Sequence, residues 1–168
     1  IRKMADLILD TSDYSVHELR EYICEHYDVR DERRGLRLTV MSFGYKYGVP
    51  SEADLVFDVR FLPNPNFVRR LKRLTGRDAA VVRYLDRQSE TVQFLKRLET
   101  LLRYLLPRYN REGKSHLTIA VGCTGGRHRS VMIAERLGRR LRARDGTVSI
   151  RHRDLRLDPD RLLPGVRS

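Results

Sequence analysis

The pattern of apolar and polar residues along the chain predicts four strands. Residues 36–43 alternate between apolar and polar positions, which is the period of a half-buried strand. Residues 55–61 form a second strand, which ends at the proline-rich segment 62–65. Residues 116–121 are mostly apolar, as in a strand buried on both faces, and residues 148–150 form a last strand.

Apolar residues at helical spacing predict helices in the segments between these strands. From Ser89 to Tyr109 leucines and valine recur every three or four residues, and Pro107 is expected to help end this helix. A second apolar stripe runs from Val131 to Leu141, and its helix is expected to end at Gly146. Shorter helical pieces are predicted at 71–74 and 81–85. The alternation of strands and helices predicts an α/β fold with a single open mixed sheet flanked by helices.

The first 34 residues have a different organisation. Residues 5–12 suggest a short strand, and Ser15 with Glu18 gives the S-x-x-E capping box of a helix that is expected to run to about Tyr27. A charged segment follows, and the chain begins with Ile rather than Met. We therefore expect a piece of a longer protein, in which residues 1–34 are the tail of an upstream domain plus its linker and residues 35–168 are a separate domain.

The segment between the third strand and the following helix is typical of a phosphate-binding loop. A glycine-rich turn that leads into a helix points backbone N–H groups and the positive end of the helix dipole at one spot. The side chains around the glycines add hydroxyl, guanidinium and imidazole donors. The loop residues predicted to bind the anion are Thr124, Gly125, Gly126, Arg127, His128, Arg129 and Ser130. A plain strand-to-helix turn with arginines in solvent is the alternative.

Three charged residues lie at the ends of the first two strands. Lys46 follows the first strand, and Asp58 and Arg60 belong to the second. Ligands of open α/β sheets bind at the carboxyl ends of the strands, so these side chains are expected near the loop. A carboxylate beside a basic pocket suits a ligand with hydroxyls or an amine. The alternative is that Asp58 and Arg60 pair with each other.

The same loop has the C-x5-R-S spacing of cysteine phosphatases. In such an enzyme Cys123 would be the nucleophile, Arg129 would hold the phosphate oxygens and Asp58 would be the acid. Gly122 stands where many of these phosphatases have histidine. The alternative for Cys123 is a buried, inert thiol at a strand end.

The formal net charge of +12 favours polyanionic partners. Half of this excess lies in residues 127–154, where arginines recur along the last helix and the last strand. Contact with the backbone of a structured RNA is one interpretation, and a solvated arginine-rich face is the other. The residues predicted to bind RNA are Arg136, Arg139, Arg140, Arg142, Arg144, Arg151 and Arg153.

Composition argues against three classes of protein, namely disulfide-rich, metal-binding and membrane-spanning proteins. The two cysteines, Cys24 and Cys123, lie in dissimilar contexts, so we expect no disulfide scaffold, no metal site and a reducing cytoplasm. No apolar segment approaches the roughly 20 residues that cross a bilayer, so no membrane partner is expected.

Five stretches carry a resemblance to a known family. They are residues 42–48 (SFGYKYG), 57–65 (FDVRFLPNP), 74–76 (LTG), 122–131 (GCTGGRHRSV) and 151–154 (RHRD). On these motifs the chain resembles the RapZ/YvcJ family of bacterial RNase adapter and nucleotide-binding proteins, and the resemblance covers nearly the whole chain.

The resemblance implies a fold and a function. Family members join an N-terminal P-loop NTPase domain to a C-terminal domain with a phosphofructokinase-like α/β fold, and this chain resembles the C-terminal domain with the last strand and helix of the NTPase. No G-x-x-x-x-G-K-[ST] motif occurs, so ATP or GTP hydrolysis is not expected of this fragment, and neither is another enzymatic activity or a cofactor. The family's C-terminal domain senses glucosamine-6-phosphate and binds small RNA and an RNase or two-component regulatory partner to control amino sugar synthesis. A homo-oligomer is also expected.

Carried over by matching position, the resemblance implies a ligand set. Its members here are Lys46, Asp58, Thr124, Gly125, His128 and Arg129. Asn66 stands where many family members have histidine after Asn-Pro, so the resemblance adds it as a hydrogen-bonding ligand residue without a titrating group.

Overall fold

The computed structural model describes residues 9–12, 14–16, 18–19, 22–23, 36–145 and 148–157, without the side chains of residues 143–145. The chain divides into two compact units, residues 1–34 and 35–168. In the first unit the predicted capping box is present, because the backbone N–H of Ser15 donates to Glu18 Oε2 (2.8 Å) and that of Glu18 to Ser15 Oγ (3.3 Å). Residues 9–12 of the predicted strand 5–12 are described and do not form a strand, whereas residues 5–8, the end of the helix and the linker lie outside the described residues. That this unit is the tail of an upstream domain stays a prediction.

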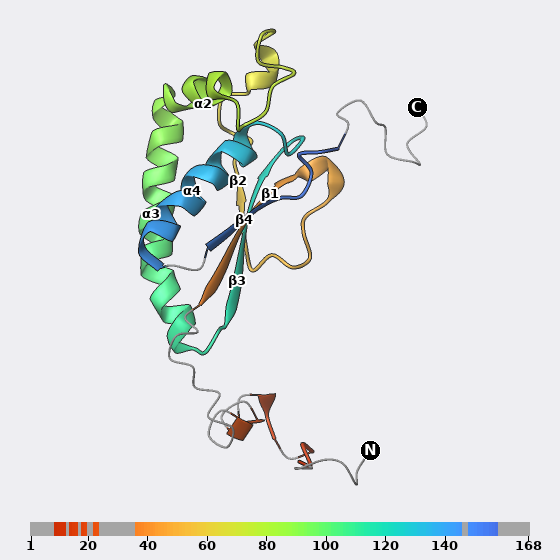
Figure 1. The fold of residues 1–168 in the computed structure, drawn as a ribbon, viewed down its shortest axis with the longest axis vertical. Helices are drawn as coiled ribbons and strands as arrows, with labels where there is room; N and C mark the ends of the chain where they lie inside the picture. Colours follow the sequence, from red (N-terminus) through yellow and green to blue (C-terminus); the bar gives the residue numbers. More distant parts are fainter. Residues whose placement is uncertain are drawn as a thin grey trace, which may run out of the picture. The chain divides into compact units, whose positions relative to one another are not determined.

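The second unit alternates strands and helices (Figure 1). Its elements are β1 (Arg37–Gly44), the 3-10 turn η2 (Tyr45–Tyr47), β2 (Leu55–Asp58), the 3-10 turn η3 (Pro65–Phe67), α2 (Ala79–Asp86), α3 (Ser89–Arg111), β3 (His116–Cys123), α4 (Arg129–Asp145) and β4 (Val148–His152). The four predicted strands and both long helices are confirmed, with the correction that β2 ends at Asp58, so Arg60 lies in the turn after the strand and not in it. Residues 71–74 form turns rather than a helical piece.

Helix α3 passes through Pro107 and ends later than the sequence suggested. The helix stops where Gly113 takes a left-handed conformation (φ 81°). The N–H of Gly113 donates to the carbonyl of Asn110, and the N–H of Lys114 donates to that of Tyr109. This pair of hydrogen bonds satisfies the last carbonyls of the helix, so the glycine and not the proline sets the end.

The sheet has the strand order β2-β3-β1-β4, and every described pair is parallel. The expected open α/β sheet flanked by helices is therefore confirmed, with the correction that the described strands are parallel rather than mixed. The sheet's longest pairing joins β1 to β3 along eight residues each, from Arg37 opposite His116 to Gly44 opposite Cys123. The carboxyl ends of these two central strands consequently lie side by side.

The connections place the helices on one face of the sheet. From β2 to β3 and from β3 to β4 the chain advances in the same direction across the sheet, and right-handed crossovers then put α3 and α4 on the same side. Figure 1 shows α2, α3 and α4 together on that side. The step from β1 to β2 runs the opposite way, so residues 45–54 cross the other face, where Tyr45 packs beside Gly122.

Two apolar clusters hold the helices on the sheet. The first joins Leu38 and Ile119 of the strands to Leu102 of α3 and Leu137 of α4. The second lies at the carboxyl edge and joins α2 and α4 to the turn that carries Leu62. Burial of each such side chain contributes about 1.5–3 kcal/mol, so the loops at the carboxyl edge stand on a rigid base.

Candidate phosphate-binding site

The connections that leave β1 and β3 go to opposite faces of the sheet. A crevice opens where two neighbouring strands diverge in this way, and it is where open α/β sheets bind ligands. Residues 44–48 form one wall and residues 123–129 form the other. The two walls touch, because the N–H of Lys46 donates to the carbonyl of Thr124 (3.2 Å).

Glycines allow the two walls to approach each other. A β-carbon on Gly44 would lie 2.7 Å from the carbonyl carbon of Gly125, and one on Gly126 would lie 2.7 Å from the nitrogen of Gly44. Gly126 also has a left-handed backbone (φ 68°), which glycine adopts without a steric penalty. Gly125 differs, because a β-carbon there would enter open space. The loop is thus packed on one side and open on the other.

A hollow of about 280 Å³ lies on the open side of the loop. Four of its residues are cationic, namely Lys46, Lys72, Arg127 and Arg129. The remaining lining residues are polar or small: Asn64, Asn66, Cys123, Thr124, Gly125 and His128. No carboxylate stands among these described lining residues, so the hollow has the electrostatics of an anion site.

The loop uses its backbone carbonyls and its backbone N–H groups differently. The recorded hydrogen bonds of the loop use its carbonyls, since those of Thr124, Arg127 and His128 accept from Lys46, Gly76 and Met132. Within the described part of the chain, no backbone N–H from 125 to 128 donates to another residue. The first N–H groups of a helix have no intrahelical partner, and together with the helix dipole they favour an anion at the start of α4.

Arg129 is a buried cation that holds the site together. Its side chain is 5% exposed, and Nη1 donates to the carbonyls of Arg60 (2.6 Å) and Leu62 (2.9 Å). Nη2 approaches Thr124 Oγ1 at 3.4 Å, and the buried Nε has no protein partner among the described residues. Arg129 forms no ion pair in the described part of the chain, although the carboxylate of Asp58 is near enough to feel its charge. A bound anion would therefore give this buried guanidinium a direct partner.

His128 is predominantly structural. Its ring is buried, and Nε2 donates to the carbonyl of Leu71 at 3.2 Å, because a carbonyl can only accept. Burial lowers the pKa of His128 below 6.5, with further lowering by Arg127 and Arg129, although the backbone acceptors oppose it. The neutral ring is therefore the form that the fold favours.

Asp58 and Arg60 stand beside the hollow rather than in its lining. Arg60 Nη2 and Nε donate to Asp58 Oδ2 at 2.7 and 2.9 Å, so the two residues pair as the alternative interpretation held. This hydrogen bonding lowers the pKa of Asp58, and the charge of Arg129 lowers it further. The guanidinium of Arg60 also lies over the ring of Tyr45, 4.1 Å from its centroid. The Asp58–Arg60 pair therefore lies next to Arg129, outside the two walls of the crevice.

Cys123 belongs to the lining of the hollow, but both its thiol and the hydroxyl of Ser130 are buried. The thiol is 3% exposed in the second apolar cluster, and its Sγ lies 3.1 Å from Ser130 Oγ, which is fully buried. Ser130 does not line the hollow. A phosphatase nucleophile needs an exposed thiolate in electropositive surroundings, and the arginine of the motif is here bound to carbonyls. The geometry gives the phosphatase alternative no support.

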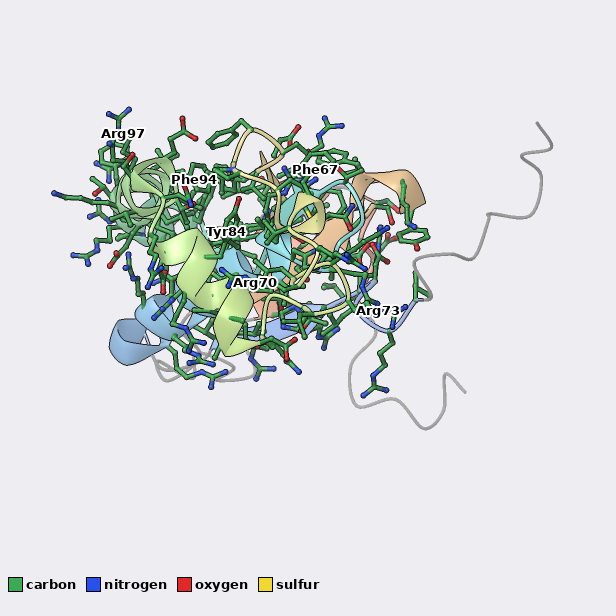
Figure 2. All side chains as sticks on the ribbon, turned by 90° about the horizontal axis from the view of Figure 1, so that it is seen from above. Phe67, Arg70, Arg73, Tyr84, Phe94 and Arg97 are labelled. Atoms are coloured by element: carbon green, nitrogen blue, oxygen red, sulfur yellow. The ribbon has the colours of Figure 1, made fainter. Side chains whose placement is uncertain are left out.

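Arginine side chains project from many sides of the domain (Figure 2). Those predicted to bind RNA do not form one free face. Arg151 lies on the strand face opposite α4, and the side chain of Arg144 is outside the described part. The others have internal partners: Arg136 pairs with Asp86, Arg139 with Glu135, Arg140 with Glu99 and Arg153 with Asp154, while Arg142 donates to the carbonyl of Val148.

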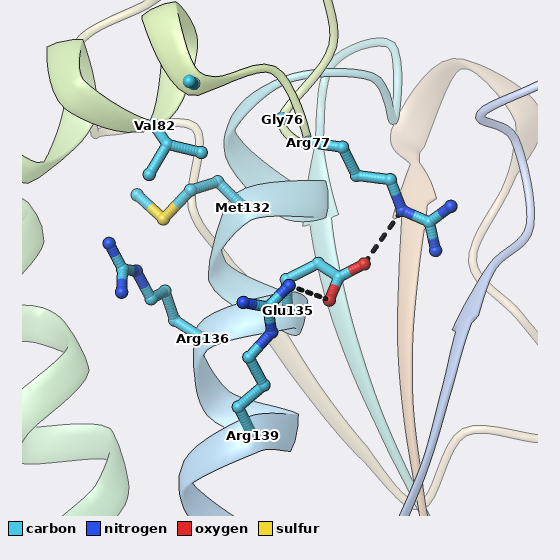
Figure 3. A pocket seen from close by; sticks show the side chains of 8 residues that line it. Gly76, Arg77, Val82, Met132, Glu135, Arg136 and Arg139 are labelled. Carbon is cyan, nitrogen blue, oxygen red and sulfur yellow. Dashed lines mark hydrogen bonds and ion pairs between the residues drawn. The ribbon is translucent and has the colours of Figure 1, made fainter.

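A groove between α2 and α4 illustrates this pairing (Figure 3). The hollow of about 480 Å³ includes Val82, Met132, Arg136 and Arg139 in its lining. Glu135 lies in its middle and accepts from Arg77 Nε (2.8 Å) and from Arg139 Nη2 (3.4 Å). Much of the positive charge in this groove is thus already matched by the protein.

Comparison with known proteins settles the family. A family model described as the RapZ C-terminal domain matches residues 36–156. The chain belongs to this family. It is 53% identical over 155 residues to a nucleotide-binding protein of Solibacter usitatus, covering 92% of this chain and 48% of the relative. A nucleotide-binding protein of Acidobacterium capsulatum is also 53% identical over 155 residues (92% and 50%), and one of Clostridium botulinum is 48% identical over 156 residues (92% and 53%).

The chain therefore spans about half the length of the curated relatives it matches. The family's long motifs lie at the hollow described above, since Lys46, Asn64 and the 123–129 loop all belong to them. Three lining residues, Asn64, Lys72 and Cys123, were not among the predicted ligand residues, and Cys123 had been considered only as the nucleophile of the phosphatase alternative. Asn64 was visible within the Asn-Pro motif, whereas Lys72 lay in a cluster of basic residues with no signal that separated it from its neighbours.

Neither a metal cluster nor a membrane-spanning helix is found among the described residues. They contain no group of three or more histidine, cysteine, aspartate or glutamate side chains that could hold a metal ion. None of the helices in the described part is long and apolar enough to cross a membrane.

Proposed function

We propose that the hollow at the start of α4 binds the phosphate of a sugar phosphate, an amino sugar phosphate such as glucosamine-6-phosphate in the first place. The observation that carries the proposal is the absence of carboxylates from a lining that contains Lys46, Lys72, Arg127 and Arg129 beside unused backbone N–H groups. A dianionic phosphate satisfies several of these donors at once. The membership of the RapZ C-terminal domain family supports the sugar phosphate class.

The remaining lining residues suit the sugar. Asn64 and Asn66 each carry an amide that donates and accepts, which is what ring hydroxyls require. An amine on the sugar needs an acceptor, and Asp58 is the carboxylate beside Arg129. In the proposed complex the amine takes the place of Arg60 at Asp58. This exchange is plausible because the Arg60–Asp58 pair is half exposed and such pairs contribute little stability.

A thermal-shift titration tests the proposal with glucosamine-6-phosphate, glucose-6-phosphate and inorganic phosphate. A ligand at about 100 times its dissociation constant stabilises the fold by roughly 2.7 kcal/mol. We expect glucosamine-6-phosphate to give the largest shift, and Asp58→Asn to remove its advantage over glucose-6-phosphate. Absence of stabilisation by every sugar phosphate at millimolar concentration would end the proposal.

The second part of the proposal is that the domain acts as an adapter for small RNA and for an RNase or a two-component regulatory partner, as a homo-oligomer. The net charge of +12 and the family support it. The phosphate contacts of an RNA make affinity fall steeply with salt, so a gel-shift titration across salt measures them. A flat dependence on salt would contradict the RNA part and would leave the sugar phosphate part untouched.

A further inference from the structure

A second basic hollow lies beside α2, away from the phosphate-binding site. Its volume is about 480 Å³, and its lining consists of Arg70, Leu71, Ala80, Arg83, Tyr84, Arg87 and Gln88. The described lining contains no carboxylate, and it shares no residue with the lining of the phosphate-binding hollow. We call it the α2 hollow.

The arginines of the α2 hollow differ from those of α4. Within the described part of the chain, Arg70, Arg83 and Arg87 form no ion pair, whereas Arg136 and Arg140 each have a carboxylate partner. All three are exposed. Arg83 lies in α2, and Arg87 is the residue that caps its C-terminus. Because the two residues are four positions apart, their like charges lie on the same side of the helix and repel each other. The helix dipole favours a cation at this end, but it does not account for Arg70, which comes from another segment.

Aromatic rings accompany these unpaired charges. Tyr84 is half-buried and lines the hollow, and η3, which packs against α2, carries Phe67 with 85% of its surface exposed. Figure 2 shows Phe67, Arg70 and Tyr84 on the side of the molecule seen from above. Aromatic rings among arginines are typical of surfaces on which unpaired bases stack while phosphates bind the cations.

We propose that the α2 hollow binds single-stranded RNA, with phosphates on Arg70, Arg83 and Arg87 and a base stacked on Tyr84. The inference deepens the RNA part of the proposed function and rests on it for the choice of RNA. A duplex presents phosphates but keeps its bases stacked inside, so it leaves Tyr84 and Phe67 unused. An acidic peptide matches the arginines but not the rings. Unpaired nucleotides match both.

The α2 hollow and the phosphate-binding hollow share a segment of chain. Leu71 lies in the floor of the α2 hollow, and its carbonyl accepts the hydrogen bond from His128. The residues on either side separate the two sites, since Arg70 lines the α2 hollow and Lys72 lines the phosphate-binding one.

Fluorescence anisotropy with an oligouridylate of about 12 nucleotides tests the inference on the whole chain. The variant Arg83→Gln/Arg87→Gln is compared with Arg37→Gln/Arg111→Gln, which removes the same charge from two exposed arginines at the opposite end of the sheet. We expect the first variant to reduce the slope of log affinity against log salt by about 1.4 and the second to leave it nearly unchanged. Equal slopes for the two variants would overturn the inference and indicate general attraction to the net charge.

Substitution of the ring separates RNA from other anions. Tyr84→Leu keeps the apolar packing and is expected to weaken RNA binding by about fivefold or more, whereas Tyr84→Phe keeps the stacking surface and the affinity. An unchanged affinity in Tyr84→Leu, or a polyglutamate peptide that competes as well as the oligouridylate, would assign the hollow to an acidic protein segment instead. All four variants should keep the thermal shift with glucosamine-6-phosphate. A negative result for RNA binding at the α2 hollow is therefore distinguishable from a negative result for the sugar phosphate site.

Discussion

The backbone N–H of Gly44 donates to Asp154 Oδ2 at 2.7 Å, which ties the end of β1 to the segment after β4. Asp154 is 2% exposed, and the guanidinium of Arg153 binds both of its carboxylate oxygens. The β-carbon of Asp154 also lies against Gly126 of the phosphate-binding loop. One buried carboxylate thus positions both walls of the crevice without entering it.

Asp154→Ala should destabilise the domain by about 2–3 kcal/mol, because it leaves a buried N–H and a guanidinium without their acceptor. Urea denaturation measures this change, and exposed Glu52→Ala serves as the control. An Asp154→Ala protein as stable as the control would show that Asp154 does not hold the two walls.

Gly125→Ala and Gly126→Ala should have opposite effects on folding and binding. A β-carbon on Gly126 meets the nitrogen of Gly44 in a left-handed backbone, so we expect a loss of stability of about 1–3 kcal/mol. A β-carbon on Gly125 enters open space beside the hollow, so the fold should stay intact while sugar phosphate binding weakens. Thermal melts with and without glucosamine-6-phosphate give both quantities. Equal melting temperatures for the two apo variants would contradict the packing described for the loop.

Arg129→Met and Lys72→Gln separate a structural cation from a surface one. Arg129→Met removes the bonds to the carbonyls of Arg60 and Leu62 and should cost about 2–4 kcal/mol of stability as well as ligand binding. Lys72 is exposed, so its substitution should weaken ligand binding with little change in stability. Urea melts and ligand titrations on each variant check the pair. Loss of binding in neither variant would exclude this hollow as the anion site.

Acidification should destabilise the domain through His128. Burial lowers the pKa of His128 below its ordinary value of 6.5, so the unfolded chain binds a proton that the folded one does not. The stability that the neutral ring contributes is complete above pH 6.5 and is lost as the pH falls from 6.5 through the folded pKa. His152, whose pKa burial also lowers, adds to the same slope. Urea melts between about pH 7.5 and 5.5 should therefore show a smaller loss in His128→Gln than in the unsubstituted protein. Identical losses of unfolding free energy in the two proteins would contradict the conclusion that the fold favours neutral His128.

Cys123→Ala should keep sugar phosphate binding within a few fold, because the thiol is buried against Ser130 and is not needed to hold an anion. The domain and the variant are both expected to leave p-nitrophenyl phosphate unhydrolysed. Turnover by the domain that disappears in Cys123→Ala would revive the phosphatase interpretation.

Much of the site could be predicted from local sequence. A glycine pair after an apolar strand and before a helix specifies a loop with outward N–H groups, and residues 124–129 are where the structure places it. Parallel pairing then brings Lys46 to the same edge because β1 and β3 end opposite each other. Asp58 and Arg60 were placed in the right strand region, but their mutual pairing depends on side-chain rotamers that the sequence leaves open.

The sequence did not predict which surface arginines have carboxylate partners. The spacing of Arg136 and Arg140 on one helix face was read correctly, but their partners Asp86 and Glu99 come from α2 and α3. Arg70 stood in the same basic cluster as Lys72, and Arg83 and Arg87 stood in a less conspicuous segment. None of the three has an ion-pair partner in the described chain. Whether a surface charge is matched depends on which helices pack together, which is a property of long-range contacts.

Local sequence was enough to predict the order of strands and helices, the glycine-rich loop before α4 and the family, because each depends on residues that are close in the chain or on long continuous motifs. The tertiary structure alone decided which donors face the hollow, that His128 and Arg129 are buried supports, and which arginines are unpaired. These properties depend on burial and on contacts between residues distant in the chain, such as His128 with Leu71 and Gly44 with Asp154. Local pattern carries no information on either.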